Sequence, residues 1–135
     1  MLASGLSDSV ADDEDLARFL TQSNHFNTLV AKPAAFLPHT TSRNTSVSRH
    51  GRDPLDDLKA LGKEAAGARK LYGAAILKAA DAHRVSLVVV ASEPPLRHAV
   101  IVGWPWDDAD PELQKAKQKE LALSLCSAAG PPLIF

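Results

Sequence analysis

The sequence predicts a single α+β domain, in which a short mixed or antiparallel sheet packs against two or three helices. Its 135 residues suit one domain, and its 45% hydrophobic and 23% charged residues are typical of a folded globular protein. The expected order is helix, loop, strand, helix, strand or helix, strand, strand and helix, which indicates the α+β class. We expect the domain to span residues 13–129, after a poorly ordered leader at 1–12 and before an apolar tail at 130–135.

The first predicted element is a short helix over residues 13–21. Leu16, Phe19 and Leu20 recur at the i, i+3, i+4 spacing of one helix face. Acidic residues precede them, and negative charge in a first turn is favourable at the positive end of the helix dipole.

A loop-rich stretch follows over residues 21–45, with many Ser, Thr and Asn residues. Its one apolar piece, residues 29–37, is interrupted by Pro33. Because proline cannot donate to a sheet ladder, this piece is an edge segment at best. Residues 46–49 then predict a short strand between two polar boundaries.

The best-marked element is a helix over residues 54–69. Asp53 can cap its start, and Pro54 suits the first helical position, where no backbone N–H is required. Apolar residues from Leu55 to Ala65 recur on one face, and basic residues stand at the C-terminal end.

Residues 71–85 are ambiguous, because alanine favours a helix while the short apolar core at 74–77 also fits a strand. Residues 87–90 are apolar on both faces and predict a central strand, and residues 98–102 predict a second strand. Since both faces of these strands are apolar, we expect packed layers on both sides of the sheet.

The last predicted helix covers residues 111–128, where Asp110 and Pro111 repeat the cap-then-proline start of the earlier helix. Its first half is rich in Lys and Gln and is expected to be solvated. Residues 121–129 are apolar nearly all round, which predicts a buried second half. The apolar tail that follows must dock on the domain or stay exposed.

Charge and cysteine content exclude several classes of protein. The 15 Lys and Arg residues nearly balance 16 Asp and Glu, so no overall field attracts nucleic acid. The longest apolar run, residues 87–91, is far too short to span a membrane, and we expect no membrane partner. The lone Cys126 lies in an apolar stretch and is expected to be a small buried hydrophobe in a reducing compartment. These features favour a cytoplasmic protein.

The common signatures of enzymes are absent from the sequence. It has no glycine-rich phosphate loop, no H-E-x-x-H, no C-x-x-C and no G-x-S-x-G. Three histidines, His25, His39 and His50, lack the spacing of a metal-ligand pair, even with Asp53 or Glu93 added. We therefore expect no metal and no cofactor, and the sequence leaves open whether the chain is an enzyme.

The remaining candidates for a binding or catalytic site are three Arg/His dipeptides, Arg49-His50, His83-Arg84 and Arg97-His98. Guanidinium groups bind phosphate or carboxylate in a fork, and a neutral imidazole can act as a base. Neighbours on a strand point to opposite faces, so Arg97 and His98 line one pocket only if they lie in the loop before the strand. The alternative interpretation is structural, with these side chains bonded to backbone or water at a sheet edge.

The candidate ligand-binding set is therefore Arg49, His50, Arg97 and His98, together with Trp104 and Trp106. The two tryptophans flank Pro105, and such a pair can stack on a base or on a partner's proline-rich segment. More often such tryptophans close the edge of a core, with the ring buried and the indole N–H hydrogen-bonded.

Short motifs give the chain a resemblance to a group of small, uncharacterised bacterial proteins. Residues 36–38 (FLP), 46–49 (SVSR) and 95–103 (PLRHAVIVG) match their F-x-P, S-V-x-R and P-x-x-H-A-x-I-x-G layout. The resemblance covers residues 13–126 and implies no activity. It favours a strand at 73–78 followed by a helical turn, and it picks out Arg49, His98 and Gly103.

Two classes of function follow. The slightly favoured one is a non-enzymatic interaction module, which binds a macromolecular partner or self-associates through the tryptophan edge and the tail residues Leu133, Ile134 and Phe135. The alternative is a nucleotide- or phosphate-binding protein or enzyme, in which the Arg/His cluster holds a small anionic ligand.

Overall fold

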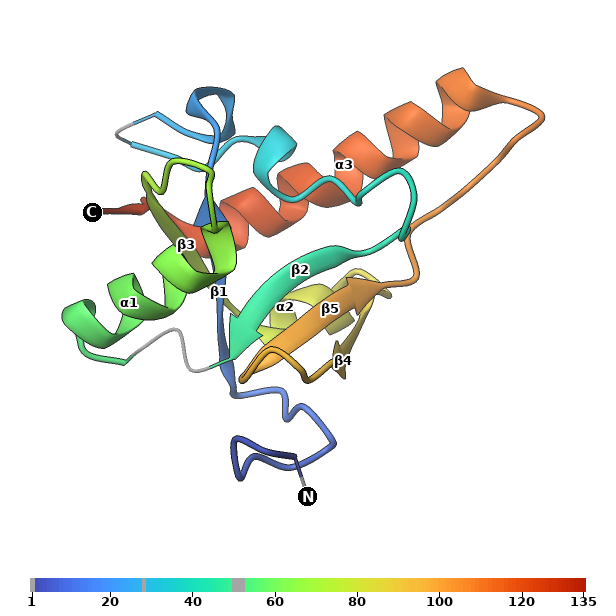
Figure 1. Ribbon diagram of the computed structural model, residues 1–135. Helices are drawn as coiled ribbons and strands as arrows, with labels where there is room; N and C mark the ends of the chain where they lie inside the picture. The colour runs from blue at the N-terminus through green and yellow to red at the C-terminus, as the bar shows by residue number, and fades with distance from the viewer. Residues whose placement is uncertain (1, 28, 50–52) are drawn as a thin grey trace.

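A computed structural model describes residues 2–27, 29–49 and 53–135 and shows one six-stranded sheet (Figure 1). The strand order is β4-β5-β2-β1-β3-β6, and every neighbouring pair is antiparallel. The predicted α+β class is confirmed. The strands are β1 (Asp15–Leu20), β2 (Thr45–Arg49), β3 (Gly73–Lys78), β4 (Val88–Ala91), β5 (His98–Val102) and β6 (Leu133–Ile134).

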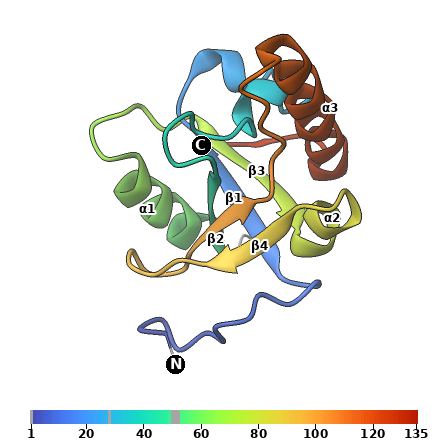
Figure 2. The same ribbon diagram turned by 90° about the vertical axis from the view of Figure 1, so that its right-hand side faces the viewer.

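The helices lie on both faces of the sheet. Figure 2 shows α1 (Leu55–Ala66) on one side and α2 (Ala79–Arg84) with α3 (Pro111–Ala129) on the other. Two 3-10 turns, η1 (Ser23–His25) and η2 (Pro33–Ala35), belong to the loop between β1 and β2. In the described part of the chain, no helix combines the length and apolar character that crossing a bilayer requires.

Both long predicted helices are confirmed. α3 starts as expected, with the Asp110 side chain accepting a hydrogen bond from the Leu113 N–H. α1 ends at Ala66, three residues earlier than predicted, because Gly67 adopts a φ of 60° that leaves the helical region.

The predicted helix at 13–21 is wrong, since these residues form strand β1. Leu16 and Leu20 enter the larger core on the α3 side, whereas Ala17 and Phe19 enter a smaller core under α1. Apolar residues at these four positions fit one helix face, but they also fit a strand buried on both faces. Pairing with β2 on one side and β3 on the other makes the strand the better solution.

The ambiguous stretch 71–85 forms strand β3 and then helix α2, as the resemblance favours. β3 pairs with β1 along its full length, from Asp15 opposite Lys78 to Leu20 opposite Gly73. The strands predicted at 46–49 and 98–102 are confirmed by β2 and β5.

β4 is an edge strand, so the prediction of a central strand at 87–90 is wrong. It pairs with β5, and the strand order ends there. The side chains of Val88 and Val90 are 50% and 44% exposed. The expected cover on both faces is therefore incomplete, because α1 packs against β1 and β3 and not against this half of the sheet.

The second half of α3 is buried on one face only, which corrects the expectation of a wholly buried segment. Ala122, Leu125 and Cys126 are buried, whereas Leu123 is exposed. The position of Cys126 confirms a buried hydrophobe, and burial raises the pKa of its thiol to about 11.

The apolar tail docks on the domain as strand β6 beside β3. Gly73 makes this possible, because a Cβ there would collide with the Leu133 carbonyl oxygen. The side chains of Leu133 and Ile134 remain about half exposed, and Phe135 packs against the smaller core.

Candidate functional site

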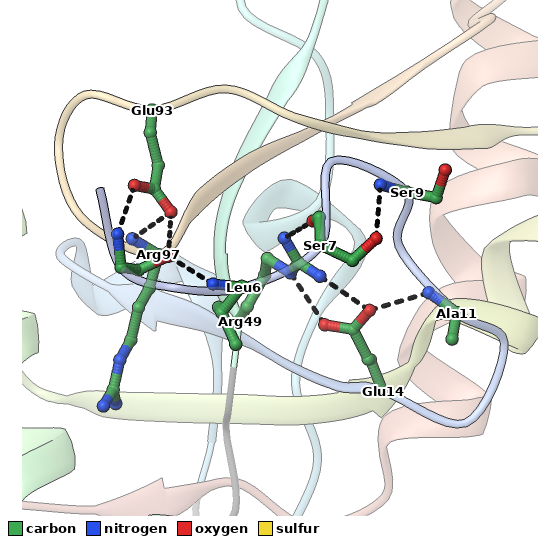
Figure 3. Close-up of polar contacts among 9 residues, drawn as sticks. Leu6, Ser7, Ser9, Ala11, Glu14, Arg49, Glu93 and Arg97 are labelled. Atoms are coloured by element: carbon green, nitrogen blue, oxygen red, sulfur yellow. Dashed lines mark hydrogen bonds and ion pairs between the residues drawn. The ribbon is translucent and has the colours of Figure 1, made fainter. Parts of the chain in front are cut away.

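Arg49, the first predicted site residue, is buried and fully engaged inside the protein (Figure 3). Its Nε and Nη2 atoms donate to the two carboxylate oxygens of Glu14, at 2.7 and 2.8 Å, and Nη1 donates to the Ser7 carbonyl oxygen at 2.7 Å. This bidentate pair joins β2 to the segment before β1 and holds the leader against the sheet. The geometry supports the structural interpretation of Arg49.

The leader has further polar contacts with the loop between β4 and β5. Ser4 donates through its backbone N–H and its hydroxyl to the Glu93 carboxylate, which also accepts from the Arg97 N–H (Figure 3). These hydrogen bonds, with the Ser4 hydroxyl contributing most, lower the pKa of Glu93 below its ordinary value. The N-terminal segment thus crosses one end of the sheet with defined partners.

Arg97 and His98 do not share a pocket. Arg97 precedes β5, in a left-handed conformation with φ of 65°, and its guanidinium forms an ion pair with Asp53. His98 lies on the strand, and its Nδ1 is 2.9 Å from the Ser92 carbonyl oxygen. Because a carbonyl only accepts, Nδ1 carries the proton of the neutral ring and Nε2 is an acceptor. His50 lies outside the described residues.

Trp104 and Trp106 lie in different surroundings and do not form a pair. Trp104 is buried in the larger core, and its indole N–H donates to the Ile101 carbonyl oxygen at 3.2 Å. This is the core-closing arrangement that the sequence suggests. Trp106 is half-buried, and the guanidinium of Arg43 lies 4.6 Å from the centre of its ring.

The polar cavity with the clearest chemistry is formed by residues outside the predicted set. We call it the arginine cavity, and it encloses about 330 Å³ between β1, the end of α1 and the loop that carries η1 and η2. Among the described residues that line it, none is acidic. They are Arg18, Thr21, Gln22, Asn24, His25, Ala34, Leu37, His39, Asn44, Ser46 and Arg69.

Arg18 reaches this cavity because β1 and β2 separate early. Their ladder holds only two residue pairs, Leu16 with Arg49 and Ala17 with Ser48. The Arg18 side chain then bonds to the backbone beside this opening, with Nη1 donating to the Ser46 carbonyl oxygen at 2.9 Å and Nε donating to that of Ala35 at 2.6 Å. These bonds fix the guanidinium without neutralising it.

Arg69 brings a second positive charge to the cavity. Its Nε and Nη2 donate to the carbonyl oxygens of Ala66 and Ala65, each at 3.2 Å, at the negative end of α1. Neither Arg69 nor Arg18 forms an ion pair within the described residues. Burial, and next the charge of Arg69, lowers the pKa of Arg18 to about 10. Two neighbouring guanidinium groups therefore lack a carboxylate counter-ion.

His25 lines the same cavity and carries a buried nitrogen without a partner. The residue is only 6% exposed, and its Nδ1 has no hydrogen-bond partner among the residues that the structure describes. Burial, followed by the charges of Arg18 and Arg69, lowers the pKa of His25 to about 4. The ring is thus neutral near pH 7, and it keeps a buried polar atom of a kind that proteins normally satisfy.

The remaining wall also offers hydrogen-bond donors. His39 Nδ1 accepts from the Thr41 N–H at 3.1 Å, so the proton of its neutral ring sits on Nε2. The Asn44 amide oxygen accepts from the Ser42 hydroxyl at 3.1 Å, which leaves the amide NH₂ group as a donor. A donor-rich wall around two cations is complementary to an anion.

A second cavity adjoins the first. We call it the His98 cavity, and it encloses about 160 Å³ between α1, β2 and the start of β5. Arg18, Thr21, Ser46 and Arg69 line both cavities and form their junction. Its other lining residues are Phe19, Val47, Ser48, Ala65, Ala66, Pro95 and His98.

Of the predicted site residues that the structure describes, only His98 lines either of these two cavities, while Arg18, His25 and Arg69 enter the site without having been predicted. A helix at 13–21 would place Arg18 on a solvated face, so the wrong periodicity concealed it. The available signal was a charged residue within the apolar run Leu16–Leu20. Within the described ranges, no three His, Cys, Asp or Glu side chains gather as a metal ion would require.

Comparisons with known proteins identify no relative. No family model matches the chain, and neither the curated proteins nor the solved structures contain a significant match.

Replacement of Arg49 by Met is expected to destabilise the protein by about 3–5 kcal/mol, because it removes the buried cation that pairs with Glu14. Arg97→Gln should cost less than about 1 kcal/mol, since solvent weakens its partly exposed pair with Asp53. Urea unfolding of both variants measures the difference. Equal losses would contradict the anchoring role of Arg49.

Stability is expected to fall as the pH is lowered from about 6.5 toward 4, because His25 takes up a proton more readily in the unfolded chain than in the folded one. The variant His25→Asn removes this contribution, so its melting temperature should decline less over that range. Thermal melts of both proteins in phosphate-free buffers measure the two slopes. Parallel slopes would show that His25 does not titrate as described.

Proposed function

We propose that the chain binds a phosphate-bearing small molecule, with Arg18 and Arg69 holding the phosphate in the arginine cavity. The observation that carries this proposal is the combination of two guanidinium groups without a carboxylate and a buried His25 nitrogen without a partner. One anion at the arginine cavity would give both guanidinium groups the counter-charge that they lack among the described residues.

The energetic cost of this arrangement in the ligand-free protein supports the proposed binding site. Neighbouring cations repel each other, and burying an unpaired polar atom costs about 1–3 kcal/mol. Proteins keep such unfavourable arrangements mainly where function requires them. By contrast, Arg49, which is fully buried, has a bidentate carboxylate partner and needs no ligand.

Phosphate suits the cavity better than a carboxylate does. A guanidinium fork can bind two oxygens of one phosphate, and phosphate has further oxygens for the donors of His39 and Asn44. A phosphorylated metabolite also agrees with the cytoplasmic location that we infer from the single buried thiol of Cys126.

Arg69→Gln is expected to weaken the binding of inorganic phosphate by about 10- to 100-fold, the equivalent of losing one charged hydrogen bond. The stability of the ligand-free protein should stay equal or rise, because the repulsion with Arg18 is removed. Isothermal titration and urea unfolding measure the two effects. A purely structural arginine would change stability without changing affinity.

The matched control is Arg97→Gln, which removes a guanidinium that lines neither cavity. It should retain the phosphate affinity of the original chain. If Arg97→Gln weakens binding as much as Arg69→Gln does, binding reflects overall charge, and the proposed site is wrong.

A second candidate function is self-association of an interaction module through β4. This edge strand carries no charged residue, and its exposed side chains, Val88 and Val90, share one face of the sheet. An uncharged edge readily accepts another strand, and a two-fold axis would bring the valines of two copies together. The opposite edge strand, β6, is only two residues long, whereas β4 has four residues, so the edge at β4 is a better surface than the tail.

Val90→Lys is expected to abolish concentration-dependent dimerisation, because a lysine on an edge strand opposes strand pairing. Leu123→Lys, at an exposed position of α3, is the control and should dimerise normally. Sedimentation equilibrium over a wide concentration range measures both. A monomer at every concentration in the original chain would exclude this second function.

A further inference from the structure

The arginine cavity adjoins a space of different chemistry. Arg18 and Arg69 line both cavities, so an anion held between them lies where the two meet. A ligand that consisted of phosphate alone would leave the His98 cavity unfilled. Because the two cavities adjoin at these arginines, a ligand whose phosphate they hold can place a second part in the His98 cavity.

We propose that the ligand is a nucleoside 5′-monophosphate, with the phosphate in the arginine cavity, the sugar at the junction and the base in the His98 cavity. This inference rests on the proposed function and adds the identity of the organic group. The junction supplies the hydroxyl groups of Thr21 and Ser46, which suit the oxygens of a sugar.

The size and lining of the His98 cavity favour a flat, uncharged ring. Its volume of about 160 Å³ is comparable to that of a cavity known to admit one benzene ring. Phe19, Val47, Ala65 and Pro95 provide apolar contacts, and no acidic residue is among the described residues that line it. A cationic group would lose hydration there without gaining an opposite charge.

His98 gives the cavity a polar group with a defined role. Its Nδ1–H donates to Ser92, so Nε2 can accept a hydrogen bond from an amino or imino group of a base. Ser48 faces the same cavity from β2, directly opposite His98 in the sheet register. An uncharged heterocycle with a hydrogen-bond donor on its edge satisfies these groups.

The test compares three probes by isothermal titration: inorganic phosphate, ribose 5-phosphate and cytidine 5′-monophosphate. Cytidine 5′-monophosphate should bind about tenfold or more tightly than ribose 5-phosphate, through ring burial and one hydrogen bond. His98→Ala should remove this gain and leave the affinity for inorganic phosphate unchanged. His83→Ala, which lies outside both cavities, should retain the gain.

A second variant keeps the inference falsifiable if His98→Ala fails to fold. Ala65→Leu fills the His98 cavity from the exposed surface of α1 and should also remove the gain for the nucleotide. If phosphate binds and the nucleotide binds no more tightly than ribose 5-phosphate, this inference is wrong and the proposed function stands. The same conclusion holds if the gain survives in both variants. If no probe binds, both proposals fail.

Discussion

The structure depends on one strand, β1, that is buried on both faces and yet carries a positive charge. Leu16 and Leu20 join the larger core, and Ala17 and Phe19 join the smaller one. Between them, Arg18 cannot lie in either core without losing its hydration. The early separation of β1 from β2 gives its guanidinium a place beside the Ser46 backbone, and this separation opens the arginine cavity.

The arginines with a structural role differ from those of the candidate site in the partners that their guanidinium groups have. Arg49 and Arg97 each have a carboxylate partner, Glu14 and Asp53. These pairs join the leader and the start of α1 to the sheet. Among the described residues, Arg18 and Arg69 have only backbone carbonyl partners, and their charges, after burial, also lower the pKa of His25. The same side chain therefore has two roles in one small domain, depending on whether an acidic residue accompanies it.

The sequence predicts correctly those helices and strands whose ends are marked by nearby residues. The starts of α1 and α3 are marked by proline and aspartate, and β2 and β5 by short runs between polar boundaries. β1 and β4 were mispredicted because their apolar residues fit two arrangements, and only the pairing of distant strands decides between them. The site was missed for a related reason. The sequence draws attention to neighbours such as Arg97-His98, whereas Arg18, His25 and Arg69 meet only after the sheet and the η1–η2 loop have formed.

The most direct test of the central claim is an NMR titration of ¹⁵N-labelled protein with inorganic phosphate, observing the histidine ring nitrogens and the arginine Nε–H groups. The account predicts that His25, Arg18 and Arg69 shift together and saturate at one dissociation constant, while the Nε–H of Arg97 does not shift. Saturable binding that leaves His25 and Arg18 unchanged would place the phosphate elsewhere and contradict the account.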